Sequence, residues 1–252
     1  MTNDQLLEIS TEIGLSLLEN GAEIYRVEES ISRILSAYGV VNADVFAVPT
    51  CIITTIVLKD GQTHTRMKRI MNRSTNLDIV SAMNNLSREL CKLKPEYDEA
   101  KKLVNQAKNR KRFSLPIQIL GCVFIGSFFT IFFGGNFYDA LVSLLCCVVL
   151  KFLLVVMDKF KTNMFFSYTV GSMAIAAIAF LFHYLGFSQN MDKVIIGSLM
   201  NLVPGVALTN SMRDIIAGDL VAGLTKFVEA IMIAVAIAVG TGVCVYLLKM
   251  FV

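Results

Sequence analysis

The stretch that decides the fold is LPIQILGCVFIGSFFTIFF, residues 115–133, which contains no Asp, Glu, Lys or Arg. The hydrocarbon core of a bilayer is about 30 Å thick, and a helix of roughly 20 apolar residues crosses it. The stretch therefore predicts a transmembrane helix, because a helix satisfies its own backbone hydrogen bonds in lipid. Further apolar stretches lie near residues 140–157, 167–185, 194–208 and 230–248. Together these stretches predict about five transmembrane helices.

Toward the N-terminus the composition changes near Arg112. The chain of 252 residues is 55% hydrophobic, but charged residues are frequent before Arg112 and apolar runs there are short. We therefore expect a cytoplasmic domain over residues 1–112 and a transmembrane domain over residues 113–252. The predicted fold class is an α-helical integral membrane protein with about five transmembrane helices, preceded by a small α/β cytoplasmic domain.

Lysine and arginine in the flanks of the spans predict the orientation, because these residues are enriched on the cytoplasmic side. The segment before the first span is rich in them: Lys101, Lys102, Lys108, Arg110, Lys111 and Arg112. The loop 134–139 has none, whereas the loop 158–166 contains Lys159 and Lys161. We expect a multi-pass protein of a bacterial plasma membrane with a cytoplasmic N-terminus and an external C-terminus.

The segment before the spans shows helical and strand periodicities. Apolar spacing from Leu6 to Leu17 and from Ile24 to Ile34 predicts two helices. Runs rich in β-branched residues predict strands at 45–48, 51–58 and 63–70, with Lys59-Asp60-Gly61-Gln62 as a hairpin turn. Two more helices are expected at 77–90 and 96–109. The predicted order is ααβββαα.

Several classes of function are disfavoured by what the sequence contains. The six cysteines form no CxxC pair, and His64 and His183 are far apart, so we expect neither a disulfide framework nor a metal site. A net charge of +3 gives no case for nucleic acid. No Ser/His/Asp set, HExxH or phosphate-cradling glycine loop is present, so we expect no enzyme and no cofactor. The first residues show no cleaved signal peptide.

Polar residues around a Pro-Gly pair form the most informative cluster. A proline inside an apolar segment frees backbone groups from the helix ladder, and such breaks line transporter sites. Ionisable residues at the membrane are costly, which makes them functional candidates. The predicted substrate or proton pathway consists of Asn201, Pro204, Gly205, Asn210, Arg213, Asp214, Asp219 and Glu229. The plainer alternative is a proline kink beside a charged loop.

A second group of candidates lies in the cytoplasmic segment. Glu23, Arg26 and Glu28 lie at the start of the second helix and could serve gating by pairing with the charged internal loops. The alternative is a solvated helix face with weak ion pairs. Pro49 and Thr50 are expected at the start of a strand, with Arg66 on the partner strand, and they belong to the same candidate gating or coupling group. The plainer alternative to a functional role is an edge-strand proline beside a solvated arginine.

Three of these stretches resemble the threonine/serine exporter family. They are Gly21 through Glu28, Pro49-Thr50 ahead of the hairpin, and Pro204-Gly205 through Asn210, Arg213-Asp214 and Gly218 to Gly223. Full-length members of that family fuse this unit to a second, smaller group of membrane helices. The resemblance implies that a shorter chain is the large component of a two-protein system, with a small membrane partner encoded separately.

The resemblance implies a subunit of a secondary-active exporter of small polar metabolites in the lipid bilayer. Its expected substrates are threonine and serine, moved out by proton antiport, with Glu229 and Asp214 as candidate proton carriers. Arg213 would pair a substrate carboxylate or hold Asp214. The first rival is a dicarboxylate exporter subunit, chiefly for succinate. Rivals of another class are a regulatory or scaffolding membrane subunit and a membrane-tethered enzyme domain. A homo-oligomer is compatible with all of them.

Overall fold

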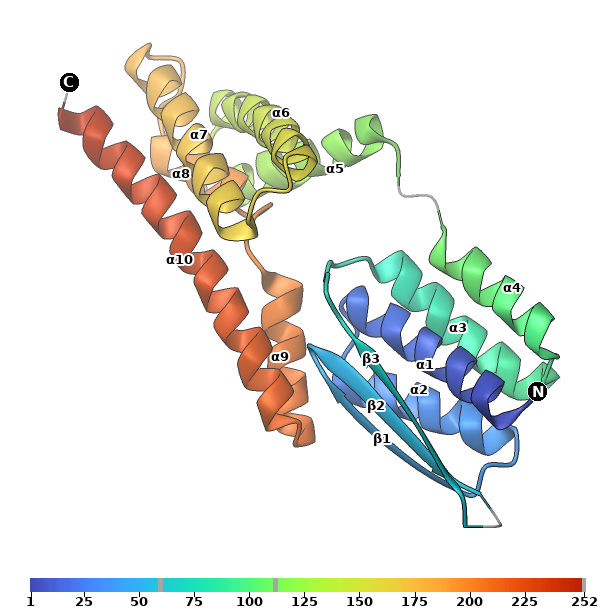
Figure 1. The fold of residues 1–252 in the computed structure, drawn as a ribbon. Helices are drawn as coiled ribbons and strands as arrows, with labels where there is room; N and C mark the ends of the chain where they lie inside the picture. Colours follow the sequence, from blue (N-terminus) through green and yellow to red (C-terminus); the bar gives the residue numbers. More distant parts are fainter. Residues whose placement is uncertain (59–60, 111–112, 251–252) are drawn as a thin grey trace. The chain divides into compact units, whose positions relative to one another are not determined.

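The computed structural model describes residues 1–58, 61–110 and 113–250, and it contains two compact units (Figure 1). The α/β unit comprises Met1–Lys111 and Val206–Val228, and the helical unit comprises Arg112–Gly205 and Glu229–Val252. The predicted division assigned residues 206–228 to the transmembrane domain, whereas in the structure they pack with the N-terminal residues. The predicted boundary at Lys111-Arg112 lies outside the described residues.

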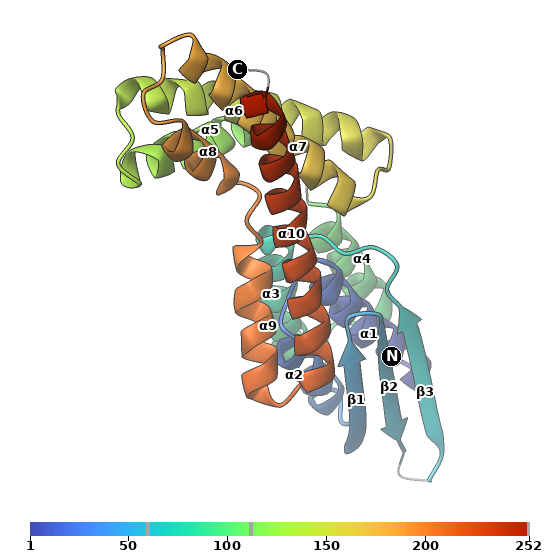
Figure 2. The ribbon, with the colours of Figure 1, turned by 90° about the vertical axis from the view of Figure 1, so that its left-hand side faces the viewer.

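The α/β unit has the predicted order ααβββαα, followed much later in the chain by α9 and the start of α10 (Leu220–Met250). Its elements are α1 (Asn3–Glu19), α2 (Ile24–Ala37), β1 (Asn42–Val48), β2 (Cys51–Val57), β3 (Thr63–Arg69), α3 (Leu77–Leu93), α4 (Tyr97–Lys108) and α9 (Gly205–Ala217). Figure 2 shows the sheet beside the layer of N-terminal helices. The apolar faces of α1, α2 and α3 and the inner face of β2 form its core, which Ala222 of α10 also enters.

The sheet is antiparallel in the order β1-β2-β3. Val48 pairs with Cys51, so Pro49 and Thr50 form the two-residue turn between β1 and β2. The prediction that they begin a strand was therefore wrong, because proline has no N–H for a ladder but has the fixed φ that a turn accepts. In the second turn Gly61 has a φ of 82°, and the predicted Lys59-Asp60 pair lies outside the described residues.

The helical unit is built from apolar helices. They are α5 (Leu115–Phe132), α6 (Phe137–Lys159), α7 (Met164–Tyr184), α8 (Met191–Leu199) and the greater part of α10 (Leu220–Met250). In the part of the chain that the structure describes, four helices are long and apolar enough to cross a membrane: α5, α6, α7 and α10.

The predicted span at 194–208 is not one helix. α8 ends at Leu199, residues 200–204 are not helical, and α9 begins at Gly205. Pro204 has no N–H to donate and disfavours helical geometry in the residue before it, which explains the interruption. α8 alone, at about 1.5 Å per residue, is too short to cross a bilayer.

α8 nevertheless runs back along α5 in the opposite direction. At its start, Asn190 donates to Asp139 near the beginning of α6. Along its length, Gly197 lies against Thr130 of α5, where a Cβ would come within 2.2 Å of the Thr130 hydroxyl. After its end, the Asn201 side chain donates to the Cys122 carbonyl of α5 at 3.1 Å. α8 and the segment after it therefore return most of the way along α5.

Candidate functional site

The loop between α1 and α2 is the centre of the candidate site. α1 ends with Asn20 and Gly21, and Gly21 adopts a φ of 91°, which favours glycine over residues with a Cβ. Ala22 and Glu23 are buried, and Ile24 is the first residue of α2. The loop is therefore a fixed, buried turn.

Four consecutive residues of this loop are held by side chains of α9 and α10. Asn210 Nδ2 donates to the Gly21 carbonyl at 2.9 Å, and Lys226 Nζ donates to the Ala22 carbonyl at 3.1 Å. An Arg213 nitrogen donates to Glu23 Oε1 at 2.9 Å, and the Ile24 amide donates to Asp214 Oδ1 at 3.0 Å. We call this arrangement the clamp: residues 21–24 with Asn210, Arg213, Asp214 and Lys226. All of it lies within the α/β unit.

Asp214 is the most buried charge of the clamp. Its side chain is 0% exposed, and its Oδ2 accepts from Lys226 Nζ at 2.7 Å, with Lys226 12% exposed. Its Oδ1 binds the first amide of α2, where Glu23 at the N-cap position makes no side-chain cap. One carboxylate thus both caps α2 and neutralises a buried ammonium group.

Glu23 carries the second ion pair of the clamp. It accepts from both Arg26 and Arg213 at 2.9 Å, and its side chain is only 8% exposed. Burial raises the pKa of Glu23, but hydrogen bonds from its own backbone amide and from Arg213, with the charge of Arg26, lower that pKa below its usual value. Glu23 therefore stays ionised at neutral pH and keeps Arg213 in place.

Two further carboxylates lie close to this site. Glu28 accepts a hydrogen bond from the Ala47 amide of β1 at 2.8 Å. Burial, and then the charges of Asp219 and Asp214, raise the pKa of Glu28 although that hydrogen bond lowers it. Burial and Asp214 likewise raise the pKa of Asp219. The site therefore concentrates negative charge that the nearby cations offset only in part.

The structure thus brings together residues that the sequence placed in two separate clusters. Asn210, Arg213, Asp214 and Asp219 lie with Glu23, Arg26 and Glu28, although about 190 positions separate the two groups. Arg213 was expected to hold Asp214 or a substrate carboxylate, but in the structure it pairs with Glu23 and Lys226 holds Asp214. Sequence reasoning missed Lys226 as a site residue. No local pattern marks Lys226, because only the fold brings its ammonium group to Asp214 and to the Ala22 carbonyl.

Other candidates lie in different surroundings. Arg66 of β3 pairs with Glu8 of α1 at 3.8 Å, and Thr50 accepts the Ile70 amide at the β1–β2 turn. In the helical unit, Asn201 donates to the Cys122 and Ser198 carbonyls. Pro204 and Gly205 lie at the break between α8 and α9. These contacts are structural, and they leave Pro49, Thr50, Arg66 and Asn201 without an assigned chemical role.

Glu229 lines a groove of about 460 Å³ in the helical unit. The remaining lining comes from the start of α7 and from the next turn of α10: Asn163, Met164, Phe165, Phe166, Met232 and Ile233. This groove is mainly apolar, with one carboxylate on its wall. We call it the Glu229 groove.

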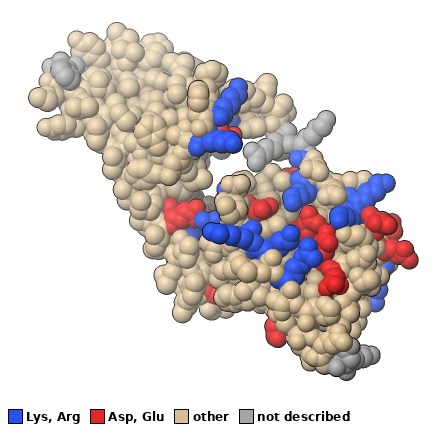
Figure 3. Space-filling view, viewed as in Figure 1, with Lys and Arg blue, Asp and Glu red and all other residues tan. Residues whose placement is uncertain are grey.

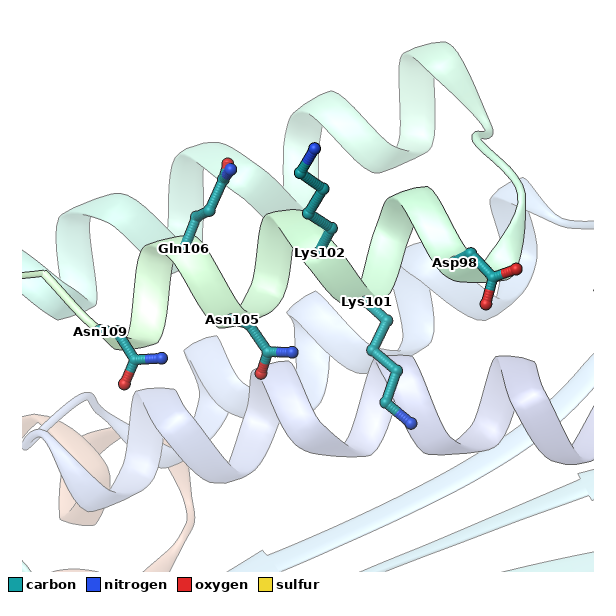
Figure 4. Close-up of a pocket in the computed structure, with 6 residues that line it drawn as sticks. All are labelled: Asp98, Lys101, Lys102, Asn105, Gln106 and Asn109. Atoms are coloured by element: carbon teal, nitrogen blue, oxygen red, sulfur yellow. The ribbon is translucent and has the colours of Figure 1, made fainter.

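The charged surface of the α/β unit also bears a polar hollow of about 640 Å³ along α4. Figure 3 shows Lys, Arg, Asp and Glu gathered on this unit, whereas the helical unit is mostly tan on the face drawn. Figure 4 shows that the hollow is lined from a single helix and that Lys101 points away from α4. Lys101 Nζ donates to Glu8 of α1 at 3.1 Å. The hollow is an open helix surface, and Lys101 on it is drawn into an ion pair with Glu8. Among the described residues, no three His, Cys, Asp or Glu side chains gather as a metal site.

Comparison with known proteins places this arrangement in a family. The model of the threonine/serine exporter family, ThrE, matches residues 8–248, which include the clamp, the Pro-Gly break, α5, α6, α7 and nearly all of α10. The chain belongs to the threonine/serine exporter family. Together with its apolar helices, this makes it a multi-pass bacterial membrane protein of a transporter family rather than an enzyme.

Individual relatives of this family are distant. The chain is 23% identical over 233 residues to the "probable succinate transporter subunit YjjP" of Klebsiella aerogenes, covering 91% of this chain and 88% of that protein. It is 21% identical over 249 residues to the threonine/serine exporter of Corynebacterium glutamicum, covering 96% of this chain and 51% of that exporter. A "probable threonine/serine exporter" of Mycobacterium tuberculosis is 19% identical over 238 residues, with 94% and 45% covered.

The share of the relative's length that the chain covers differs between the transporter subunit and the threonine/serine exporters. The chain spans nearly the whole of the transporter subunit but only about half of each threonine/serine exporter. No solved structure matches the chain.

Proposed function

We propose that the chain is a subunit of a secondary-active exporter that moves threonine and serine out of a bacterial cell by proton antiport. The observation that carries this proposal is the family match over residues 8–248, combined with the four long apolar helices. Two of the relatives named above are threonine/serine exporters. Such a protein would lie in the plasma membrane with its α/β unit in the cytoplasm, where the basic residues before α5 favour it.

A separate small membrane subunit would complete the exporter. The length comparison supports this, because the chain accounts for only about half of each threonine/serine exporter but for most of a protein named as a subunit. The partner would supply the part of the transport path that the longer relatives carry in one chain. Copies of the chain could also assemble with one another around that path.

Within this exporter we assign the clamp the role of a coupling element. Residues 206–228, which include the start of α10, pack in the α/β unit, and α10 continues from them into the helical unit. A movement of the Gly21–Ile24 loop would therefore displace the first turns of α10, which hold the loop through Lys226. Proton binding at Asp214 would release Lys226, whereas Glu229, which lies on the exposed surface of α10, is the carrier that a proton reaches more directly.

The second candidate function is dicarboxylate export. It is favoured by the relative named as a succinate transporter subunit, which the chain matches over 88% of its length. A dianion requires cationic groups in its path. In the clamp, Arg213 and Lys226 are already paired with Glu23 and Asp214, so a dicarboxylate would have to displace one of these carboxylates.

The test is flux into proteoliposomes under an imposed pH gradient, with labelled serine and labelled succinate. One set of vesicles contains this chain alone, and the other also contains the small membrane protein encoded beside it. Gradient-dependent serine flux that threonine inhibits is the expected result, and the partner should be required for it. Succinate flux without serine flux would replace the proposal by the second candidate. Absence of both fluxes, with correctly inserted protein, would favour a regulatory subunit.

A further inference from the structure

The two faces of α10 differ in what they contact. α10 is one unbroken helix of 31 residues (Figure 1). The face that packs within the chain consists of small or apolar residues that are buried: Ala222, Ala230, Ile233, Ala236, Ile237 and Cys244. This face already has its neighbours, so any further contact of α10 must use the opposite face.

The opposite face of α10 carries an exposed apolar seam. Its members recur at alternating spacings of three and four residues: Val221, Leu224, Val228, Ile231, Val235 and Ala238. All six are exposed, with Val221 at 69% and Val228 at 58%. This is the spacing of the a and d positions of a heptad repeat, along which one helix packs against another. We call these six residues the α10 seam.

The charged residues of α10 lie outside this seam. Lys226 and Glu229 fall on heptad positions f and b, and Lys249 comes after the end of the seam. Lys226 is also already used in the clamp. The positions that flank the seam, e and g, hold uncharged residues, among them Thr225, Phe227, Met232, Ala234 and Val239. A second helix would therefore meet no charge along the seam.

Lipid alone does not account for the whole seam. At about 1.5 Å per residue, α10 extends about 46 Å, whereas the hydrocarbon core of a bilayer is about 30 Å thick. The first members of the seam, Val221, Leu224 and Val228, belong to the α/β unit, whose surface bears charged side chains (Figure 3). Exposure of these apolar side chains to water is unfavourable, and a helix as long as α10 would cover them.

A second copy of α10 meets these requirements. Two copies with the same topology in the membrane have parallel α10 helices, so each seam residue faces its own counterpart and no like charges meet. Val221, Val228 and Val235 occupy one heptad position and Leu224 the other. A β-branched residue at the first position with leucine at the second favours a parallel pair.

We propose that the α10 seam is the contact surface of a homodimer in which two α10 helices pack in parallel and in register. This inference goes beyond the proposed function, because the association depends neither on a substrate nor on transport.

Disulfide cross-linking tests the register of the two helices. Val221→Cys, Leu224→Cys and Val228→Cys are introduced one at a time into the full chain, which is oxidised in vesicles with copper–phenanthroline and dissolved oxygen. A disulfide requires Cα atoms roughly 4.4–6.8 Å apart, which paired a or d positions satisfy and flanking positions do not. The matched control is Thr225→Cys, at the exposed position beside Leu224. The unsubstituted chain, with its six cysteines, gives the background.

At least tenfold more cross-linked dimer is expected from each of the three seam variants than from Thr225→Cys. Equal cross-linking of Thr225→Cys would overturn the register, and no cross-linking above background would overturn the dimer. Cross-linking to the small membrane protein encoded beside this chain, in place of a second copy, would assign the seam to that protein and also overturn the dimer.

A charge at the seam gives an independent test. Val221→Lys places two like charges opposite each other and should weaken association at least tenfold, as measured by light scattering of the detergent-solubilised chain. The control is Ile216→Lys on α9, where an 81% exposed side chain outside the seam is replaced and association should stay within twofold. A mixture of Val221→Lys and Val221→Glu chains should associate again, because the opposite charges then face each other.

Failure of this mixture to associate, or equal loss of association in Ile216→Lys, would contradict the proposed pairing. Association and flux also separate this inference from the proposed function. A dimer that moves neither serine nor succinate would retain the seam contact and reject the exporter. Serine flux from a chain that stays monomeric would retain the exporter and reject the dimer.

Discussion

At the scale of single residues, Asp214 joins two distant parts of the chain, because its carboxylate caps α2 and pairs with Lys226. Asp214 and Arg213 were identified as candidates because charge near an apolar segment is costly. Glu23 was identified as part of a charged cluster at the start of the second helix. Their pairing depends on contacts between residues about 190 positions apart, which no local periodicity records. Lys226 was noted only as further charge beside this cluster, because only the fold shows that it meets a buried carboxylate.

Asp214→Asn should destabilise the α/β unit. Asparagine keeps an oxygen for the Ile24 amide but leaves Lys226 buried without a counter-charge, which typically costs about 3 kcal/mol or more. Hydrogen exchange of the Ile24 amide in the detergent-solubilised chain measures this loss. The double variant Asp214→Asn with Lys226→Met should recover part of it. A double variant as unstable as the sum of the single variants would show that the two residues do not act as a pair.

Glu28 should make the stability of this unit fall as the pH rises. A carboxyl group with a raised pKa binds its proton more tightly in the folded chain, so its stabilising contribution is present at low pH and is lost as the pH passes through the raised pKa. Glu28→Gln keeps an acceptor for the Ala47 amide and should remove this fall above about pH 4.5. The control is Glu29→Gln, at the exposed next position. Identical pH profiles for Glu28→Gln and the unsubstituted chain would contradict the assignment.

At the scale of elements, apolar periodicity located most helices, because a helix with an apolar face or an apolar length is visible in sequence. The exceptions are α8 and α9. Residues 194–208 have the composition of a span, and only the proline at position 204 indicates that the helix stops. Residues 210–226 were expected to be a charged loop, yet most of them are helical. Their polar side chains form hydrogen bonds with backbone groups of the α1–α2 loop.

Gly223 should be essential to the approach of α10 to α9. A Cβ at this position would lie 2.5 Å from an Ile215 side-chain carbon and 2.9 Å from the Ser211 carbonyl oxygen. Gly223→Ala is therefore expected to separate the two helices and to speed exchange of the Ile24 amide at least tenfold. Gly242→Ala is the matched control on the same helix, because nothing lies within 4 Å of its added Cβ. It should be neutral or stabilise the helix by up to about 1 kcal/mol. Equal effects of both substitutions would mean that helix propensity, and not the close approach, decides the result.

At the scale of the whole molecule, the sequence predicted the class of architecture but not the assignment of residues 206–228. Amino-acid composition depends on whether a segment contacts lipid or water, so it separated the apolar stretches from the charged N-terminal segment. It could not reveal that a segment between two membrane helices contributes Ala222 to the core of the other unit. This contribution involves few residues, but it requires the chain to return to the α/β unit after α8.

The orientation of the C-terminus tests this return. If α5 begins in the cytoplasm, α8 and the segment after it return the chain along α5 toward the cytoplasmic side, and α10 then crosses to the external side. We therefore expect the C-terminus outside the cell. A reporter fused after the last residue should be active only in the external compartment, and a cysteine placed near the N-terminus should react only after the membrane is permeabilised. A cytoplasmic C-terminus would mean that α8 and residues 200–204 do not complete a crossing.

The clamp also has a consequence for the order of events during synthesis. The loop at Gly21–Ile24 leaves the ribosome early, but Asp214, which caps α2, and Lys226, which neutralises Asp214, follow only after α5 to α8 have been made. In the N-terminal part of the α/β unit, α2 therefore lacks its cap while the intervening helices α5 to α8 are made. Because residues of this late segment complete the clamp, the α/β unit reaches its final form only after α5 to α8 have been made.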